Sequence, residues 1–319
     1  MDKLKQQIDD KRNIKESTLN SYMISLRKLH EAIEGNKAFT NLNFLTDEKK
    51  VLDVISELKM NTQKNYISAA IVALHTVDAE KYEKELLTYR KYIDEFTKKN
   101  AEDLSTNEKT PDQERNWVTM EQLKRKMNEY KRDLEDRNVF NKETLTKKQT
   151  EMMQKWVVAA SYVISPENPP LRLDYGDMSV ITKNEYDDLT DDEKDGFNYL
   201  VNETRNTKFF SLGDYKTHGS HGTLIIPVSQ KLNAVYNIWL KHNTSGNFLR
   251  DSRGGNMSSN QLSKYLPQVF NIPNKKITLN LIRHVFISTH FPVELTDKQK
   301  RLAKRMGHSV LTQNQYAKK

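Results

Sequence analysis

Apolar residues recur at helical spacing through the first hundred residues of the chain. A helix is predicted to begin near Ser17 and to end at Gly35, because its apolar positions follow one face: Leu19, Tyr22, Met23, Leu26, Leu29 and Ile33. The same spacing predicts three further helices, around residues 51–58, 66–74 and 86–96. Asn61 and Thr62 are candidate caps for the third helix. Short amphipathic helices of this kind pack into a bundle, so residues 1–100 are expected to form a helical domain.

The hydrophobic pattern stops after this bundle. Residues 101–116 are polar and contain one proline, a composition typical of a linker between domains. Residues 117–319 are therefore expected to form a second domain. Helical spacing returns there in several segments, namely about 119–135, 144–164, from 231, around 258, 279–289 and 296–306.

A different period appears between about residues 178 and 228. The runs FFSL (209–212) and TLIIPV (223–228) are typical of strands, and the glycine-containing turn THGSHG separates them. The acidic stretch 185–195 is expected to be a solvated insertion ahead of this sheet. The predicted fold is therefore mainly α with a small antiparallel β-sheet, as a helical N-terminal domain followed by an α+β domain.

Charge is distributed unevenly along the chain. Residues 201–319 hold 18 basic and 5 acidic side chains, whereas residues 101–200 hold 15 basic and 22 acidic ones. A segment this basic is suited to a polyanion, and nucleic acid is the commonest one. A solvated basic face without a partner is the alternative that charge alone leaves open.

Other features of the composition narrow the function classes. The chain has no cysteine, which excludes disulfides, thiolate zinc sites and cysteine nucleophiles. The charged start MDKLKQQIDDKRN does not resemble a secretory signal, and no apolar stretch approaches the roughly 20 residues of a membrane span. An intracellular protein without membrane partners is expected.

Two arginines stand in apolar surroundings where folding alone gives them little purpose. Arg283 lies on a predicted helix among leucine, isoleucine, valine and phenylalanine, and Arg172 lies between two leucines after two prolines. A guanidinium in such a place needs an anion or a carboxylate, and for Arg172 a salt bridge to Asp174 or Asp177 is the structural alternative. Two such arginines are also what a phosphate clamp requires.

Three further residues are candidates for chemistry. Lys216 precedes the glycine turn, where a hairpin can project a lysine into a groove, although an ordinary exposed lysine is the simpler interpretation. His308 follows Gly307, which is expected to end a helix. Tyr316 lies close behind in the sequence and, taken alone, is an aromatic residue that docks the tail.

Taken together, these residues resemble the signature of the tyrosine recombinases, also called the phage-type integrase family. The segments LIRHVF and MGHS, followed by Tyr316, are similar to the family's C-terminal motifs. Arg172 resembles the family's first arginine and Lys216 its hairpin lysine, with the Ile-Pro pair of residues 226 and 227 downstream. Asn280 stands where the family usually has a histidine, and the N-terminal helices are similar to its core-binding, SAM-like domain.

The resemblance implies a site-specific DNA recombinase or integrase that works through a 3′-phosphotyrosyl intermediate. Tyr316 would be the nucleophile, while Arg172, Arg283 and Asn280 would hold the phosphate. Lys216 would protonate the leaving 5′ oxygen, and His308 would donate to the phosphate or assist the phenol. No metal or cofactor is implied. The expected partner is double-stranded DNA, with self-association into dimers or tetramers on it.

Other functions with the same chemistry stay open at this point. A type IB topoisomerase uses the same tyrosine chemistry but swivels DNA instead of exchanging strands. A catalytically weakened DNA-binding relative is conceivable because Asn280 cannot exchange a proton as histidine does. The sequence chemistry does not separate integrase, transposase and resolvase roles, and an RNA-binding role is disfavoured because no exposed aromatic sheet motif is present.

Overall fold

The computed structural model describes residues 1–12, 14–105 and 108–291 of the chain. The chain divides into two compact units, residues 1–108 and 109–319. Within these described ranges, no helix is both long enough and apolar enough to cross a lipid bilayer.

The first unit is helical and has its own core. Its elements are α1 (Asp2–Arg12), α2 (Glu16–Glu34), the 3-10 turn η1 (Asn43–Leu45), α3 (Glu48–Ile55), α4 (Met60–Asp78) and α5 (Glu83–Ser105). The helix expected from Ser17 ends as predicted, with Gly35 at a φ of 67° as its C-cap. The sequence pattern missed α1, whose Leu4 and Ile8 are nevertheless buried in this core. The expected caps of α4 were wrong, because that helix begins at Met60, before Asn61 and Thr62.

Most of the predicted linker is helical. Helix α5 continues to Ser105, and α6 (Pro111–Asn116) follows. Thr110 caps α6 in a reciprocal capping box with Gln113, and Pro111 occupies its first turn. This local capping stabilises a helix that has almost no apolar residue to bury, which is why hydrophobic periodicity did not reveal it.

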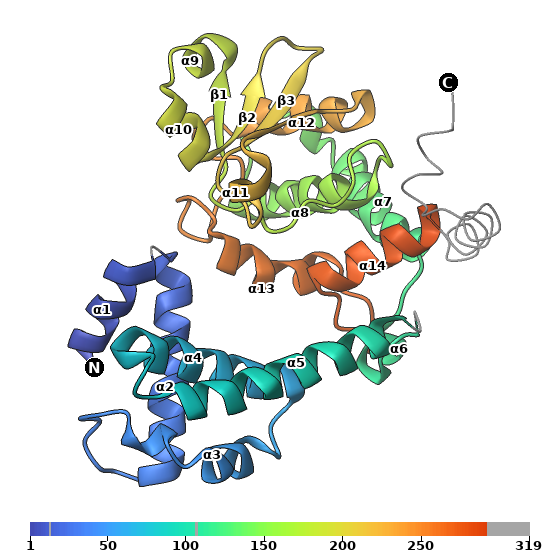
Figure 1. Cartoon of the computed structure of the whole chain (residues 1–319). Coiled ribbons are helices and arrows are strands. Elements are labelled where there is room, and N and C mark those ends of the chain that lie inside the picture. The colour runs from blue at the N-terminus through green and yellow to red at the C-terminus, as the bar shows by residue number, and fades with distance from the viewer. Residues whose placement is uncertain (13, 106–107, 292–319) are drawn as a thin grey trace, which may run out of the picture. The chain divides into compact units, whose positions relative to one another are not determined.

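The second unit combines helices with a small sheet (Figure 1). Its helical elements are α6, α7 (Met120–Asp136), η2 (Val139–Asn141), α8 (Lys147–Val163), α9 (Lys183–Asp187), α10 (Asp191–Gly196), α11 (His218–His221), α12 (Gln230–His242), α13 (Ser259–Val269) and α14 (Leu279–His290). Its strands are β1 (Ser179–Thr182), β2 (Asn198–Asn202), β3 (Lys208–Leu212) and β4 (Leu224–Pro227). The segment expected to form a helix at about 296–306 lies outside the described residues.

The sheet is mixed, which corrects the antiparallel prediction. Its order is β1-β2-β3-β4, and β2, β3 and β4 pair antiparallel as neighbouring strands of the chain. Strand β1, however, pairs parallel to β2, with Ser179 opposite Tyr199. Alternation along a strand records which face is buried but not the strand's direction. The direction of β2 is set by the crossover that connects it to β1.

That crossover is the acidic stretch, which lies inside the sheet topology and not ahead of it. It forms the short helices α9 and α10 between β1 and β2. Each begins with a capping box, Thr182 with Glu185 and Thr190 with Glu193, so part of the acidic composition serves as helix capping. The stretch is exposed, as expected, but it returns the chain to the start of β2.

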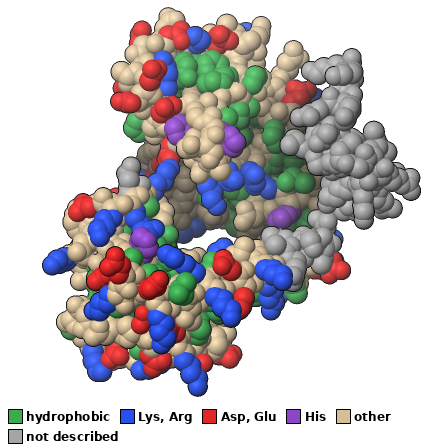
Figure 2. Space-filling model, in the orientation of Figure 1, with side chains coloured by type: hydrophobic (Ala, Val, Ile, Leu, Met, Phe, Trp, Pro, Cys, Tyr) green, Lys and Arg blue, Asp and Glu red, His purple; other side chains and the backbone are tan. Residues whose placement is uncertain are grey.

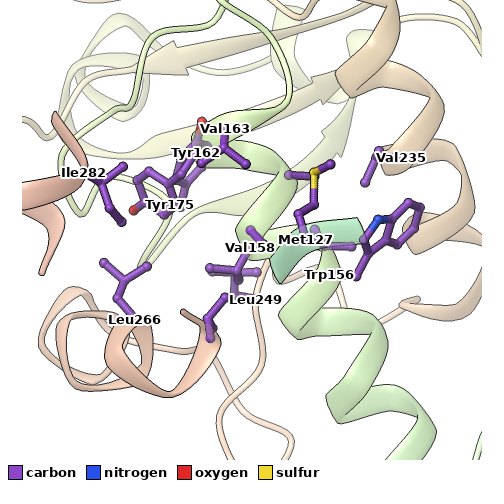
Figure 3. Packing of buried hydrophobic residues seen from close by; sticks show 14 of the residues in the cluster. Met127, Trp156, Val158, Tyr162, Val163, Tyr175, Val235, Leu249, Leu266 and Ile282 are labelled. Atoms are coloured by element: carbon purple, nitrogen blue, oxygen red, sulfur yellow. The ribbon is translucent and has the colours of Figure 1, made fainter. Parts of the chain in front are cut away.

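Helix α8 passes through the core of the second unit. Trp156, Val158, Tyr162 and Val163 are buried along it and pack with residues of other elements, such as Met127, Tyr175 and Ile282 (Figure 3). Helix α8 contacts α7, α12 and α13. Its buried residues belong to one continuous apolar core, which extends from the sheet to α14.

Residues 1–108 produced alone are expected to fold, because every residue of their buried core comes from this segment. Urea titration followed by circular dichroism should give a single cooperative transition. Leu26→Ala in the same fragment should lower the free energy of unfolding by about 2–5 kcal/mol, since Leu26 is fully buried. A broad, non-cooperative titration of the native fragment would contradict the prediction.

Candidate active site

The loop that carries Arg172 connects α8 to β1 and is anchored on α8 by two buried tyrosines. The Tyr162 hydroxyl donates to the carbonyl oxygen of Arg172 at 3.0 Å, and the Tyr175 hydroxyl donates to the carbonyl oxygen of Ser161 at 3.2 Å. The two rings meet edge to face with centroids 5.3 Å apart (Figure 3). Burial raises the pKa of both phenols, so they stay protonated and act as hydrogen-bond donors. These contacts fix the backbone of Arg172, whose side chain is exposed.

Helix α13 holds the other end of this loop. The backbone N–H of Ser259 donates to the Asp177 carboxylate at 2.9 Å, and the Ser259 hydroxyl donates to the carbonyl oxygen of Leu173 at 3.1 Å. Gly176 lies so close to this helix that a Cβ there would be 2.5 Å from the Ser259 nitrogen. Glycine is therefore required for the loop to pack against the start of α13.

Arg283 joins the same loop from α14. Its side chain is half-buried, and its Nη1 donates to the carbonyl oxygen of Pro170 at 2.8 Å, two residues before Arg172. The structure therefore brings the two arginines predicted from the sequence to one place, although they are far apart along the chain. Asn280 lies one turn before Arg283 on α14 and is exposed, so both residues lie on the same side of this helix.

Asp174 is a member of the site whose role the sequence did not reveal. Its Oδ2 accepts a hydrogen bond from the backbone N–H of Arg172 at 2.9 Å. Burial raises the pKa of this carboxyl, while the nearby charges of Arg172 and Arg283 oppose that rise. The contact between Arg172 and Asp174 is thus a backbone hydrogen bond, in place of the salt bridge that was the structural alternative for Arg172. Among the described residues, the Arg172 guanidinium makes no hydrogen bond, which is consistent with its exposure.

Lys216 lies on a separate part of the unit, in the connection between β3 and β4, as the sequence predicts for a hairpin lysine. Its side chain is exposed. Within the described part of the chain, no hydrogen bond or ion pair links Lys216 to Arg172, Arg283 or Asn280. Lys216 and the two arginines are therefore related by belonging to the same folded unit. Tyr316 and His308 lie outside the described residues.

Basic side chains gather on the face of the second unit that carries these elements. Figure 2 shows Lys and Arg side chains, with His side chains beside them, between the positions of α11 and α14. Such a concentration of positive charge suits a phosphate-bearing ligand. A cavity of about 870 Å³ lies elsewhere, at the start of α8, where residues such as Gln154, Arg250 and Tyr265 line it. None of the four described catalytic candidates lines this cavity.

Comparison with known proteins gives no family assignment for the chain. No family model, no curated protein and no solved structure matches it.

Replacement of Asp174 tests the electrostatics of the loop. A folded-state pKa above the ordinary value of 3.8 means that folding favours the protonated acid, so the stabilisation is present at low pH and is lost as pH rises through the folded-state pKa. Asp174→Asn does not titrate. The free energy of unfolding of the Asp174→Asn variant, minus that of the native chain, should therefore increase between about pH 3 and about pH 7.

Urea unfolding at both pH values measures this difference. The exposed Asp188→Asn is the matched control, because it removes one carboxylate from the same unit without touching the loop. A relative stability of Asp174→Asn that falls with rising pH would contradict the inferred direction of the pKa shift.

Proposed function

We propose that the chain is a DNA strand-transferase of the tyrosine recombinase type. The observation that carries the proposal is the convergence of Arg172 and Arg283 on one loop, through the hydrogen bond from Arg283 to the carbonyl oxygen of Pro170. Two arginines held on a rigid framework, on a basic face, are suited to a DNA phosphate.

The arginines would stabilise the charge that develops on the non-bridging oxygens of the phosphate in the transition state. A guanidinium has five N–H donors, and Arg283 uses one of them on Pro170, which leaves the others for an anion. The exposed guanidinium of Arg172 would supply the second set. Asn280, on the same side of α14 as Arg283, would add an amide donor in place of the family's usual histidine.

The reaction transfers the phosphate from one oxygen to another. The phenolic oxygen of Tyr316 forms a bond to phosphorus while the bond from phosphorus to the 5′ oxygen breaks. The phenol loses its proton to His308 or to water, and the 5′ oxygen takes a proton from the Lys216 ammonium. The phosphodiester bond is thus replaced by a phosphotyrosyl bond, which a free 5′ hydroxyl reverses in the rejoining step.

The proposed partner is double-stranded DNA, on which protomers would assemble and exchange strands. The net charge of residues 201–319 supports binding to the DNA backbone. A separately folded helical unit, residues 1–108, favours a recombinase over a swivelling topoisomerase because it offers a second binding surface for DNA or a neighbouring protomer.

Tyr316→Phe tests the function directly. A nicked suicide substrate traps the covalent intermediate, which a denaturing gel detects as a protein–DNA adduct. The native chain should give the adduct and Tyr316→Phe should give none, while both bind the same DNA with nearly equal affinity because only the phenolic oxygen is lost. An adduct formed by the variant would reassign the nucleophile, and no adduct with the native chain on any candidate site would refute the proposal.

Loss of either arginine should slow cleavage strongly. Arg172→Ala and Arg283→Ala are each expected to cost about 2.7–4 kcal/mol in the cleavage step, a factor of about 10²–10³, as for the loss of a preorganised donor to a developing oxyanion. Single-turnover rates of adduct formation measure this. Arg137→Ala is the control, since this exposed arginine pairs with Asp133 at the end of α7. Cleavage at the native rate in both variants would place the phosphate clamp elsewhere.

A further inference from the structure

The loop that carries Lys216 is closed by its own contacts. It spans residues 213–223 between β3 and β4 and includes the short helix α11. The buried Tyr215 donates from its hydroxyl to the carbonyl oxygen of Gly222 at 2.8 Å, and its ring meets His218 edge to face at 5.9 Å. The Gly222 N–H donates to the carbonyl oxygen of His218 at 2.7 Å. Lys216 therefore projects from a compact turn whose two ends are tied together.

One carboxylate of the acidic stretch contacts this loop at the first residue of α11 and again just after the helix. Asp195, at the end of α10, accepts a hydrogen bond from the Thr223 hydroxyl. Its Oδ1 also lies 3.5 Å from the buried Nε2 of His218, which makes an ion pair when the imidazole is protonated. The Thr223 hydrogen bond lowers the pKa of Asp195, so this carboxylate is charged at neutral pH.

The backbone brings α10 and the start of the loop together as well. A Cβ on Gly213 would be only 2.0 Å from the carbonyl oxygen of Lys194, so glycine alone permits this approach. The Gly213 N–H donates to the carbonyl oxygen of Phe197 at 3.0 Å. The Asn198 side chain then bonds the backbone N–H and carbonyl oxygen of Asp214, at 3.0 and 2.8 Å. The start of β2 therefore holds the base of the loop, and Asp195 of the acidic stretch contacts it at His218 and Thr223.

We propose that Asp195 is a positioning residue that places Lys216 for proton transfer to the leaving oxygen. This inference rests on the proposed function, because it assigns Asp195 to the same reaction. A general acid must come within about 2.6–3.2 Å of the atom that it protonates. A lysine side chain is long and has several rotatable bonds, so the protein directs it chiefly by fixing the backbone from which it extends. Asp195 does this through His218 and Thr223, which follow Lys216 in the loop.

The first experiment measures the loop without DNA or activity. Hydrogen–deuterium exchange of residues 213–223 should become several-fold faster in Asp195→Ala, because the hydrogen bond from Thr223 and the contact with His218, which tie the loop to α10, are lost. Asp192→Ala is the matched control: it removes the same charge from an exposed position of the same helix. Unchanged exchange of the loop in Asp195→Ala would overturn the proposal.

The second experiment identifies which step Asp195 serves. Single-turnover cleavage is compared on a normal suicide substrate and on one with a 5′-bridging sulfur, which leaves without a proton. Asp195→Ala should be about tenfold slower on normal DNA, a part of the 10²–10⁴ that a general acid supplies, and close to native on the sulfur substrate. Lys216→Ala should show the same rescue, and the double variant should be no slower than Lys216→Ala alone.

Two outcomes of the cleavage assay overturn the role of Asp195. An equal loss on both substrates would assign it to DNA binding or folding, and native rates on normal DNA would remove it from the reaction. Thr223→Val, which keeps the side-chain shape and removes the hydroxyl, should show a smaller defect with the same rescue; equal defects on both substrates would count against the proposal. A native chain that forms no adduct on either substrate overturns the proposed function and this role with it, whereas the exchange measurement still reports whether Asp195 holds the loop.

Discussion

The hydrogen bond between the Arg283 guanidinium and the carbonyl oxygen of Pro170 joins two segments 113 residues apart. Pro170 is buried and its carbonyl needs a partner, while a half-buried guanidinium needs an acceptor. One contact satisfies both requirements. Because Pro170 lies two residues before Arg172, the bond also holds Arg283 close to the backbone of Arg172. This bond is the contact through which α14 is hydrogen-bonded to the loop that carries Arg172.

Two packed aromatic residues hold the loop that accepts this bond. Tyr162 and Tyr175 are fully buried, and their hydroxyl groups bond backbone carbonyls of Arg172 and Ser161. Tyr175 also packs near Phe210 of β3 and Phe248. Buried phenols with satisfied hydroxyl groups restrict the backbone in both distance and direction, which apolar side chains of similar size do less well. The loop of Arg172 is therefore fixed by several side-chain hydrogen bonds, although it has no regular structure.

The two halves of the proposed catalytic set have separate supports. Helices α8, α13 and α14 hold the arginines, whereas the sheet and α10 hold the loop of Lys216. The proposed phosphate binding and the proposed proton transfer are therefore expected to respond differently to mutation. The acidic stretch has a structural explanation in this arrangement: it carries the chain across from β1 to β2 and ends with Asp195 against the lysine loop.

Helices such as α2, α7, α8 and α14 could be predicted from the sequence because apolar spacing and capping are local properties of the chain. Arg172 and Arg283 could be selected for a similar reason, since charge among apolar neighbours is visible in the sequence itself. The direction of β1, the contact of Asp195 with the lysine loop and the hydrogen bond from Arg283 to Pro170 could not be predicted. Each depends on where chain segments lie after folding, and a residue's spacing along the chain carries no record of it. Local periodicity thus determined the helices and the candidate residues, whereas tertiary packing decided which of those residues meet and what holds them.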